Sequence, residues 1–296
     1  MGGAGPIKTA LKPVQLLGRA FESLESSFTD GVNRMKYVLI VAFAYFLGGR
    51  AAKHGPVGEN PAGQAATQTV EVAPEKVVEG RKVVLLHGLA RSSYSMQKMQ
   101  TALDKAGFST CNIDYPSTEH PIETLALHFV LPEIKACFGS LDSEIDFVTH
   151  SMGGILVRYL ALHDQLPRIG RVVMLSPPNG GSEVVDKLGH WWLFKKMNGP
   201  AGGELGTSTS SLPLQLGAAT FDVGIITGSR TVNPILSFLI NGRDDGKVSV
   251  ENAKLEGMTD FLVVPVSHPF IMENQKVISH ALYFLQHGFF TEVTGD

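Results

Sequence analysis

The chain has 296 residues, of which 44% are hydrophobic, and it carries a formal net charge of −3 with a pI near 6.4. This length and apolar content suffice for one large α/β domain with appended segments. A weakly acidic chain without a basic stripe gives no electrostatic attraction for phosphate backbones, which excludes nucleic acid as a partner.

Cysteine and histidine usage predicts neither a disulfide framework nor a metal site. The two cysteines, Cys111 and Cys137, are too few to form a disulfide scaffold, and we expect them to be buried free thiols. A pairing between them is the alternative if the domain lies in an oxidising compartment. The ten histidines are scattered without zinc spacing, so no metal ion is predicted.

Residues 1–51 form an N-terminal segment around an uncharged apolar run at residues 37–47. The run has about half of the residues that a membrane-spanning helix needs. Arg34 and Lys36 precede it, which is typical of the hydrophobic part of a secretion signal or of a short anchor. We therefore expect a protein that is membrane-anchored through this run, or periplasmic or secreted if the segment is cleaved. A buried core helix is the alternative.

Residues 52–68 are rich in Gly, Pro, Ala, Asn and Gln, which predicts a flexible linker. The alternating residues from Thr69 to Val72 then predict a first edge strand. Residues 69–296 are accordingly predicted to form the folded domain.

Within this domain, short apolar runs alternate with segments of helical periodicity. Strands alternating with helices imply a mostly parallel, doubly wound α/β sheet with flanking helices. Pro132 lies inside the second predicted helix and is expected to kink it. The predicted strands are residues 82–86, 108–115, 145–149, 171–176, 221–227 and 261–266, and the predicted helices are residues 92–106, 122–138, 152 to about 163, and 273–288.

The alternation is interrupted at residues 182–215, which contain both tryptophans of the chain, Trp191 and Trp192. An insertion of this kind beside a site serves as a lid or as a wall for an acyl group. A packed excursion that covers the sheet is an equal alternative.

Ser151 lies where the predicted strand at residues 145–149 meets the helix that follows it. A sharp turn at such a junction holds a serine hydroxyl above the end of a parallel sheet, where a base on another loop can reach it. Gly153 and Gly154 suit the turn because a helix that starts so close to its strand leaves little room for Cβ atoms. Ser151 is therefore the candidate nucleophile, although Thr149 stands where the G-x-S-x-G pattern has its first glycine.

A serine hydroxyl needs a base to remove its proton and an acid to orient that base. His268 is the candidate base because it follows the last predicted strand, at the edge where the loops of open α/β sheets gather. Asp244 and Asp245 are the candidate acids, in a turn-rich loop between Ser151 and His268. Asp245 is favoured because Gly246 after it lets the backbone turn. Asp244 stays open, as does an Asx turn with both acids solvated.

The negative charge that develops on an attacked carbonyl needs two N–H donors. The backbone of Met152, at the start of the predicted helix, is one candidate, and the backbone of Leu89, after the first buried strand, is the other. This chemistry requires no metal and no organic cofactor.

Five pieces of the sequence occur in an order that resembles the α/β-hydrolase superfamily, specifically its bacterial lipase-like and esterase-like members. The pieces are residues 86–89, 149–154, 176–182, 245–248 and 266–268. The resemblance covers about residues 82–289 and implies the α/β-hydrolase fold, with a catalytic domain at residues 69–296 and a triad in the order Ser, Asp, His.

These observations predict a serine hydrolase that cleaves carboxylic esters through an acyl-enzyme intermediate. The expected partner is a small-molecule ester with an apolar acyl group, because an aromatic insertion and an apolar N-terminal run accompany the site. The same triad serves thioesterases and acyltransferases, which therefore stay open. A membrane-tethered binding module on a hydrolase scaffold, without turnover, is the alternative from another class.

Overall fold

The computed structural model of this chain describes residues 80–290. The expectations for the N-terminal segment, the linker and the edge strand from Thr69 lie outside the described residues. Within the described part, no helix combines the length and the apolar character needed to cross a membrane.

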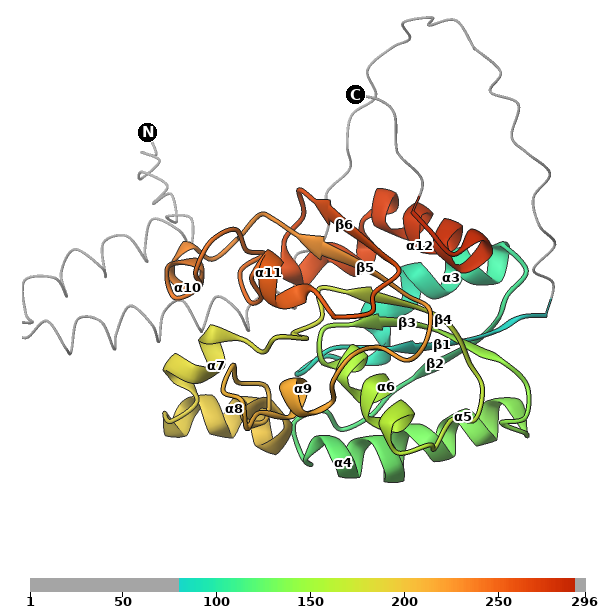
Figure 1. Ribbon diagram of the computed structural model, residues 1–296, viewed down its shortest axis with the longest axis horizontal. Helices are drawn as coiled ribbons and strands as arrows, with labels where there is room; N and C mark the ends of the chain where they lie inside the picture. Colours follow the sequence, from blue (N-terminus) through green and yellow to red (C-terminus); the bar gives the residue numbers. More distant parts are fainter. Residues whose placement is uncertain (1–79, 291–296) are drawn as a thin grey trace, which may run out of the picture. The chain divides into compact units, whose positions relative to one another are not determined.

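Six strands form one sheet in the order β2-β1-β3-β4-β5-β6 (Figure 1). Every neighbouring pair runs parallel, as the alternation of strands and helices predicts. Strand β2 lies on one side of β1, and strands β3 to β6 follow one another on the other side. The direction in which the chain adds strands to the sheet, its winding, therefore reverses between β1 and β3. The strands are β1 Lys82–Leu86, β2 Ser109–Ile113, β3 Ile145–His150, β4 Ile169–Leu175, β5 Val223–Gly228 and β6 Asp260–Val264.

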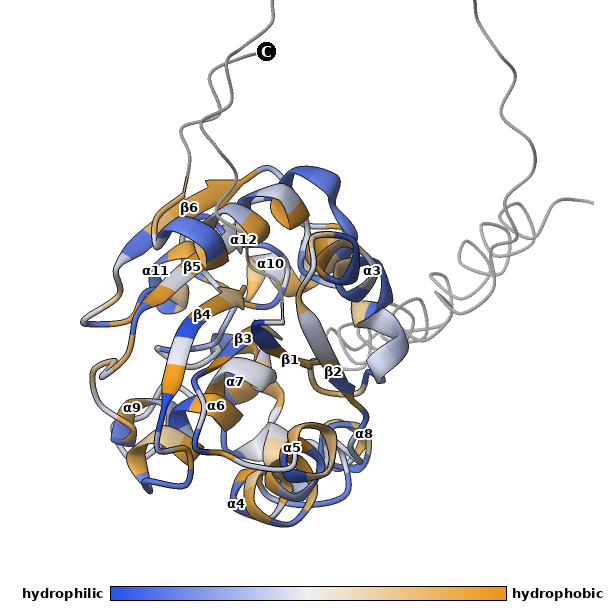
Figure 2. Cartoon of the chain, turned by 90° about the vertical axis from the view of Figure 1, so that its right-hand side faces the viewer, coloured by the Kyte–Doolittle hydropathy of each residue, from blue (hydrophilic) through white to orange (hydrophobic). Residues whose placement is uncertain are grey.

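Helices cover both faces of the sheet, with α3 and α12 on one side and α4, α5 and α6 on the other (Figures 1 and 2). The insertion at residues 182–215 is itself helical, forming α7 to α9. The helical elements are η2 Ser93–Met96, α3 Gln97–Lys105, α4 Ile122–Thr124, η3 Leu125–Val130, α5 Leu131–Phe138, α6 Met152–Leu162, α7 Glu183–Leu188, α8 Trp192–Gly203, α9 Leu212–Gln215, α10 Pro234–Phe238, α11 Val250–Ala253, η4 His268–Glu273 and α12 Gln275–His287.

The helix predicted over residues 122–138 changes its winding ahead of Pro132. Element η3 is a π-helix, and the Leu131 N–H donates to the Ala126 carbonyl, five residues back. Pro132 then occupies the first turn of α5, where its missing N–H costs no hydrogen bond. The wider turn thus accommodates the proline inside a continuous helical segment.

The core consists of two apolar clusters, one on each face of the sheet. Val84 and Leu86 point to the cluster that contains Ile155 of α6, while Val83 and Leu85 point to the cluster that contains Phe284 of α12. Successive side chains of a strand point to opposite faces, so a strand with helices on both faces is apolar at nearly every position. This explains why the strands could be predicted from continuous apolar runs.

The expectation of two buried free thiols is wrong, because Cys111 of β2 and Cys137 of α5 form a disulfide. Packing of α5 beside β2 brings the two Cα atoms to 6.2 Å, within the range that a disulfide spans. Cys111 is buried, whereas Cys137 lies at an exposed position. Proximity between residues of two separate elements is a tertiary property that cysteine counting does not contain.

Replacing both cysteines, as Cys111→Ala/Cys137→Ala, is expected to lower the free energy of unfolding by about 2–4 kcal/mol, because the disulfide restricts the unfolded chain. Urea unfolding without reductant measures the loss. As a control, reductant should weaken the wild-type protein to the level of the variant and leave the variant unchanged. Two titratable thiols in the folded, unreduced wild type would contradict the pairing.

Candidate active site

The candidate site lies at the carboxyl ends of β1 and β3, where the winding of the sheet reverses, the usual position of ligand sites in open α/β sheets. The loop after β1 touches the turn after β3. A Cβ atom added to Gly88 would lie 3.1 Å from the Ser151 Cβ and 2.8 Å from Nδ1 of His150. Only glycine therefore fits at position 88, and the two loops meet at the candidate nucleophile.

The turn that carries Ser151 is strained and tightly packed. Ser151 has φ 51° and ψ −121°, a left-handed region that residues with a side chain rarely enter. Its N–H donates to the Leu175 carbonyl at 2.8 Å, and α6 begins at the next residue. A Cβ on Gly153 would lie 2.7 Å from the Leu86 carbonyl oxygen. The structure thus confirms a sharp strand-turn-helix junction with Ser151 at its tip.

Thr149, the departure from G-x-S-x-G, is fully buried below this turn. Its Oγ1 would lie 3.3 Å from a Cβ on Gly154, so the glycine at position 154 leaves the room that Thr149 fills. The substitution in the motif is thereby accommodated within the turn itself.

Asp245 and His268 meet in a buried side-chain contact. Nδ1 of His268 lies 2.8 Å from Oδ2 of Asp245, and the two side chains are 3% and 0% exposed, respectively. The other carboxylate oxygen accepts hydrogen bonds from the backbone N–H groups of Lys247 and Val248, at 3.0 and 2.9 Å. Burial by itself would raise the pKa of Asp245, but the charge and hydrogen bond of His268, with further hydrogen bonds from Ser176 and Val248, hold that pKa below its usual value.

Asp244 has a different role. Its two carboxylate oxygens accept hydrogen bonds from the Ser237 hydroxyl, at 2.5 Å, and from the Gly246 N–H, at 2.7 Å. These contacts tie the turn to α10. The structure therefore brings Asp245, not Asp244, to His268, and because both acids are buried, the solvated Asx turn does not apply.

His150 links the serine turn to the His268 loop, a role that no sequence pattern indicated. Its ring lies 4.8 Å from the His268 ring, and its Nε2 lies 3.2 Å from the His268 carbonyl oxygen. Burial above all lowers the pKa of His150 well below its usual value, so the ring is neutral and Nε2–H donates to the carbonyl. In the described part of the chain, no hydrogen bond joins the Ser151 hydroxyl to the His268 ring. Such bonds commonly tighten only when substrate binds.

The two candidate oxyanion donors lie on either side of this junction. Met152 is the first residue of α6, where helix N–H groups are unpaired. Leu89 follows Gly88 in the loop after β1. That loop is anchored by His87, whose ring stacks on Tyr115 with centroids 4.0 Å apart and whose carbonyl accepts from the Tyr115 hydroxyl.

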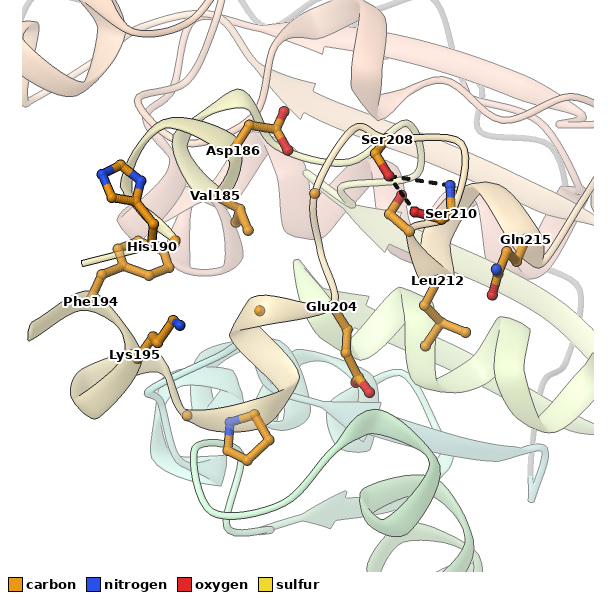
Figure 3. A pocket seen from close by; sticks show the side chains of 16 residues that line it. Val185, Asp186, His190, Phe194, Lys195, Glu204, Ser208, Ser210, Leu212 and Gln215 are labelled. Atoms are coloured by element: carbon orange, nitrogen blue, oxygen red, sulfur yellow. Dashed lines mark hydrogen bonds between the residues drawn. The ribbon is translucent and has the colours of Figure 1, made fainter. Parts of the chain in front are cut away.

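The insertion forms a wall beside this loop. A Cβ on Gly202 of α8 would lie 3.1 Å from the Leu89 side chain, and one on Gly199 would meet the Thr118 backbone. The same insertion lines an open cavity of about 900 Å³, whose lining includes Asp186, Glu204 and Ser208 (Figure 3). None of the three candidate catalytic residues lines that cavity. The opening of the insertion as a lid stays a prediction.

The site thus combines a serine on a strained turn, a buried contact between an imidazole and a carboxylate, and two candidate backbone donors, at Leu89 and Met152. Together these groups could carry out nucleophilic attack on a carbonyl. Among residues 80–290, no group of three or more His, Cys, Asp or Glu side chains is arranged to hold a metal ion.

Comparisons with known proteins agree with this fold. A family model described as the alpha/beta hydrolase family matches residues 83–234, whereas no curated protein matches the chain. The mature form of Bacillus licheniformis lipase BlEst2 superposes with a TM-score of 0.55 at 22% identity, over 74% of this chain and 96% of that chain. The metagenomic carboxyl esterase MGS0156 gives 0.54 at 16% identity, over 80% of each chain. Phospholipase PlaB from Legionella pneumophila, with thio-NAD, gives 0.56 at 15% identity, over 71% of this chain and 59% of that chain. At these identities the likeness shows the fold.

Replacing Gly153 by alanine is expected to lower the free energy of unfolding by about 1–3 kcal/mol, because the new methyl group would press on the Leu86 carbonyl. Gly203→Ala is the matched control, since a Cβ at the end of α8 meets nothing within 4 Å. Thermal and urea unfolding of both variants measure the difference. Equal stability of the two variants would contradict the close packing of the serine turn.

Proposed function

Because the chain belongs to the alpha/beta hydrolase family, we propose that it is a serine hydrolase that cleaves carboxylic esters through an acyl-enzyme intermediate. The observation that carries the proposal is the buried contact of Asp245 with His268 beside the strained turn of Ser151. The lipase and esterase descriptions of the structural neighbours support a small-molecule ester as the substrate.

In the proposed reaction, the Ser151 Oγ attacks the ester carbonyl while His268 takes the hydroxyl proton. The carbonyl π electrons move to oxygen, and the N–H groups of Leu89 and Met152 stabilise that oxyanion. The tetrahedral intermediate then collapses, the bond to the alcohol breaks, and His268 donates the proton to the leaving oxygen. Water repeats the sequence on the acyl-enzyme and releases the carboxylic acid.

In this cycle Asp245 orients His268 and stabilises its positive charge. His268 becomes positively charged during each attack, and the adjacent carboxylate stabilises that charge. Two backbone N–H groups hold the carboxylate in place, so little reorganisation is needed when the proton moves. The low pKa of Asp245 keeps it ionised for this purpose.

The disulfide between Cys111 and Cys137 supports a periplasmic or secreted location, because disulfides persist mainly in oxidising compartments. Anchoring through residues 37–47 and an apolar acyl group on the substrate remain predictions that rest on the sequence.

A fluorophosphonate probe is expected to label the wild-type protein and to leave Ser151→Ala unlabelled, because the probe reacts with an activated serine. The same substitution should lower ester hydrolysis by a factor on the order of 10⁴–10⁶. Labelling is read on a gel and its site by peptide mass, with circular dichroism as the control for folding. A folded wild type that takes no label would favour the binding module without turnover.

Asp245→Asn is expected to reduce kcat by about 10³–10⁴-fold, because an amide cannot stabilise the charged imidazole or fix its tautomer. Asp244→Asn is the matched control from the same turn. It should leave kcat within about tenfold of the wild type while lowering the free energy of unfolding by about 1–3 kcal/mol, since it disturbs hydrogen bonds of a buried group. The reverse ranking of kcat would assign the acid to Asp244.

A further inference from the structure

The side chain of His150 lies between parts of the candidate site that come from three different loops, yet the proposed reaction does not use it. His150 is the last residue of β3, and Ser151 follows it directly in the chain. The residue is buried, with 2% of its surface exposed. A polar ring at this depth needs a hydrogen-bond partner, because the loss of water otherwise costs free energy.

The partner of the His150 ring is the backbone of His268. Nε2 of His150 lies 3.2 Å from the carbonyl oxygen of His268, and the centroids of the two rings are 4.8 Å apart. A carbonyl oxygen can only accept, so Nε2 carries the proton of this hydrogen bond. Nδ1 of His150 has no hydrogen-bond partner within residues 80–290, which fits a neutral ring without a proton on this nitrogen.

The opposite edge of the ring lies against the loop after β1. A Cβ atom built on Gly88 would lie 2.8 Å from Nδ1 and 3.2 Å from Cε1 of His150. The imidazole is therefore packed between the backbone of Gly88 and the backbone of His268. A side chain in contact on two sides in a close-packed interior has little freedom to change its rotamer.

Three hydrogen bonds hold His268 itself. Its N–H donates to the Asp245 carbonyl at 2.9 Å, and its Nδ1 lies 2.8 Å from Oδ2 of the same residue. The third is the bond that its carbonyl accepts from His150 at 3.2 Å. Asp245 thus fixes the base relative to the acid, and His150 fixes it relative to the serine turn.

This third hydrogen bond bears on the reach from base to nucleophile. His150 and Ser151 share a peptide bond, so one side chain and one hydrogen bond connect the backbone of the nucleophile to the backbone of the base. The serine turn is anchored in its turn, because the Ser151 N–H donates to the Leu175 carbonyl. A base must lie within hydrogen-bond reach of the proton that it removes, and small displacements of a catalytic group lower the rate strongly.

We propose that His150 is a positioning residue for the base: its hydrogen bond to the His268 carbonyl holds the His268 imidazole at the distance from which it removes the Ser151 proton. The inference rests on the proposed serine hydrolase function and adds a fourth side chain to it. His150 itself takes up no proton in this role and acts only through His268. Because the same base serves acylation and deacylation, both steps depend on this hydrogen bond.

The variants His150→Met and His150→Gln test the hydrogen bond. The two side chains are of similar length, but only glutamine carries an amide N–H that can replace Nε2–H as the donor. His150→Met should lower kcat for 4-nitrophenyl butyrate, and the rate at which a fluorophosphonate labels Ser151, by about 10- to 100-fold, the cost of a displacement on the order of 1 Å. KM should change little, because His150 acts on the base and not on the substrate. His150→Gln should retain most of both rates.

A role in packing alone predicts the opposite ranking. Without a hydrogen bond, burial of the glutamine amide would cost more free energy than burial of the methionine thioether, so His150→Met would be the more active variant. His280→Met is the matched control and should leave both rates unchanged. His280 is also a buried histidine whose Nδ1 has no partner among the described residues, and it lies on α12. Circular dichroism and urea unfolding report whether each variant is folded.

A measurement on the wild type makes the test independent of the variants. In nitrogen-15 correlation spectra near neutral pH, the His150 ring should be the neutral tautomer with its proton on Nε2. The resonance is assigned through its bonds to the backbone of the same residue. If a variant does not fold, the tautomer decides.

The inference is overturned if His150 carries its proton on Nδ1, if folded His150→Met matches a wild type that is labelled at Ser151, or if folded His150→Gln is no more active than folded His150→Met. Those outcomes leave the proposed hydrolase function intact. A wild type that takes no label and hydrolyses no ester would instead remove both proposals.

Discussion

The close approach of two backbones at the centre of the sheet is the constraint on which the site depends. Parallel pairing of β1 with β3 places the Leu86 carbonyl against Gly153 and places Gly88 against Ser151, with no room for a Cβ at either glycine. At this contact the serine has its left-handed conformation, and α6 begins at the next residue. The loops after β5 and β6, which carry Asp245 and His268, therefore approach a turn whose position is fixed.

The electrostatics of the site differ between its two halves. Around Asp245, the buried carboxylate accepts hydrogen bonds from His268 and from two backbone N–H groups, which offset the loss of water. Arg91 and Lys247 lie on the neighbouring loops, where burial lowers the pKa of both side chains.

Elements away from the serine support this arrangement from outside. The insertion packs α8 against the side chain of Leu89, in the loop after β1. The disulfide joins β2 to α5 on the opposite side of β1 from β3, where β2 forms the edge of the sheet. Both features restrain the part of the domain around β1 and β2, which carries the loop after β1.

The sequence by itself determined the strands, the helices that flank the sheet and the candidates Ser151 and His268, because local patterns of apolar residues reflect burial on both faces of a strand and helical periodicity. It did not predict the helices α7 to α11. Only the tertiary structure brought Asp245 rather than Asp244 to His268, paired Cys111 with Cys137, and placed His150 beside His268. Each of these depends on which residues, far apart along the chain, become neighbours in space. Packing of the elements sets those distances, and no local pattern records them.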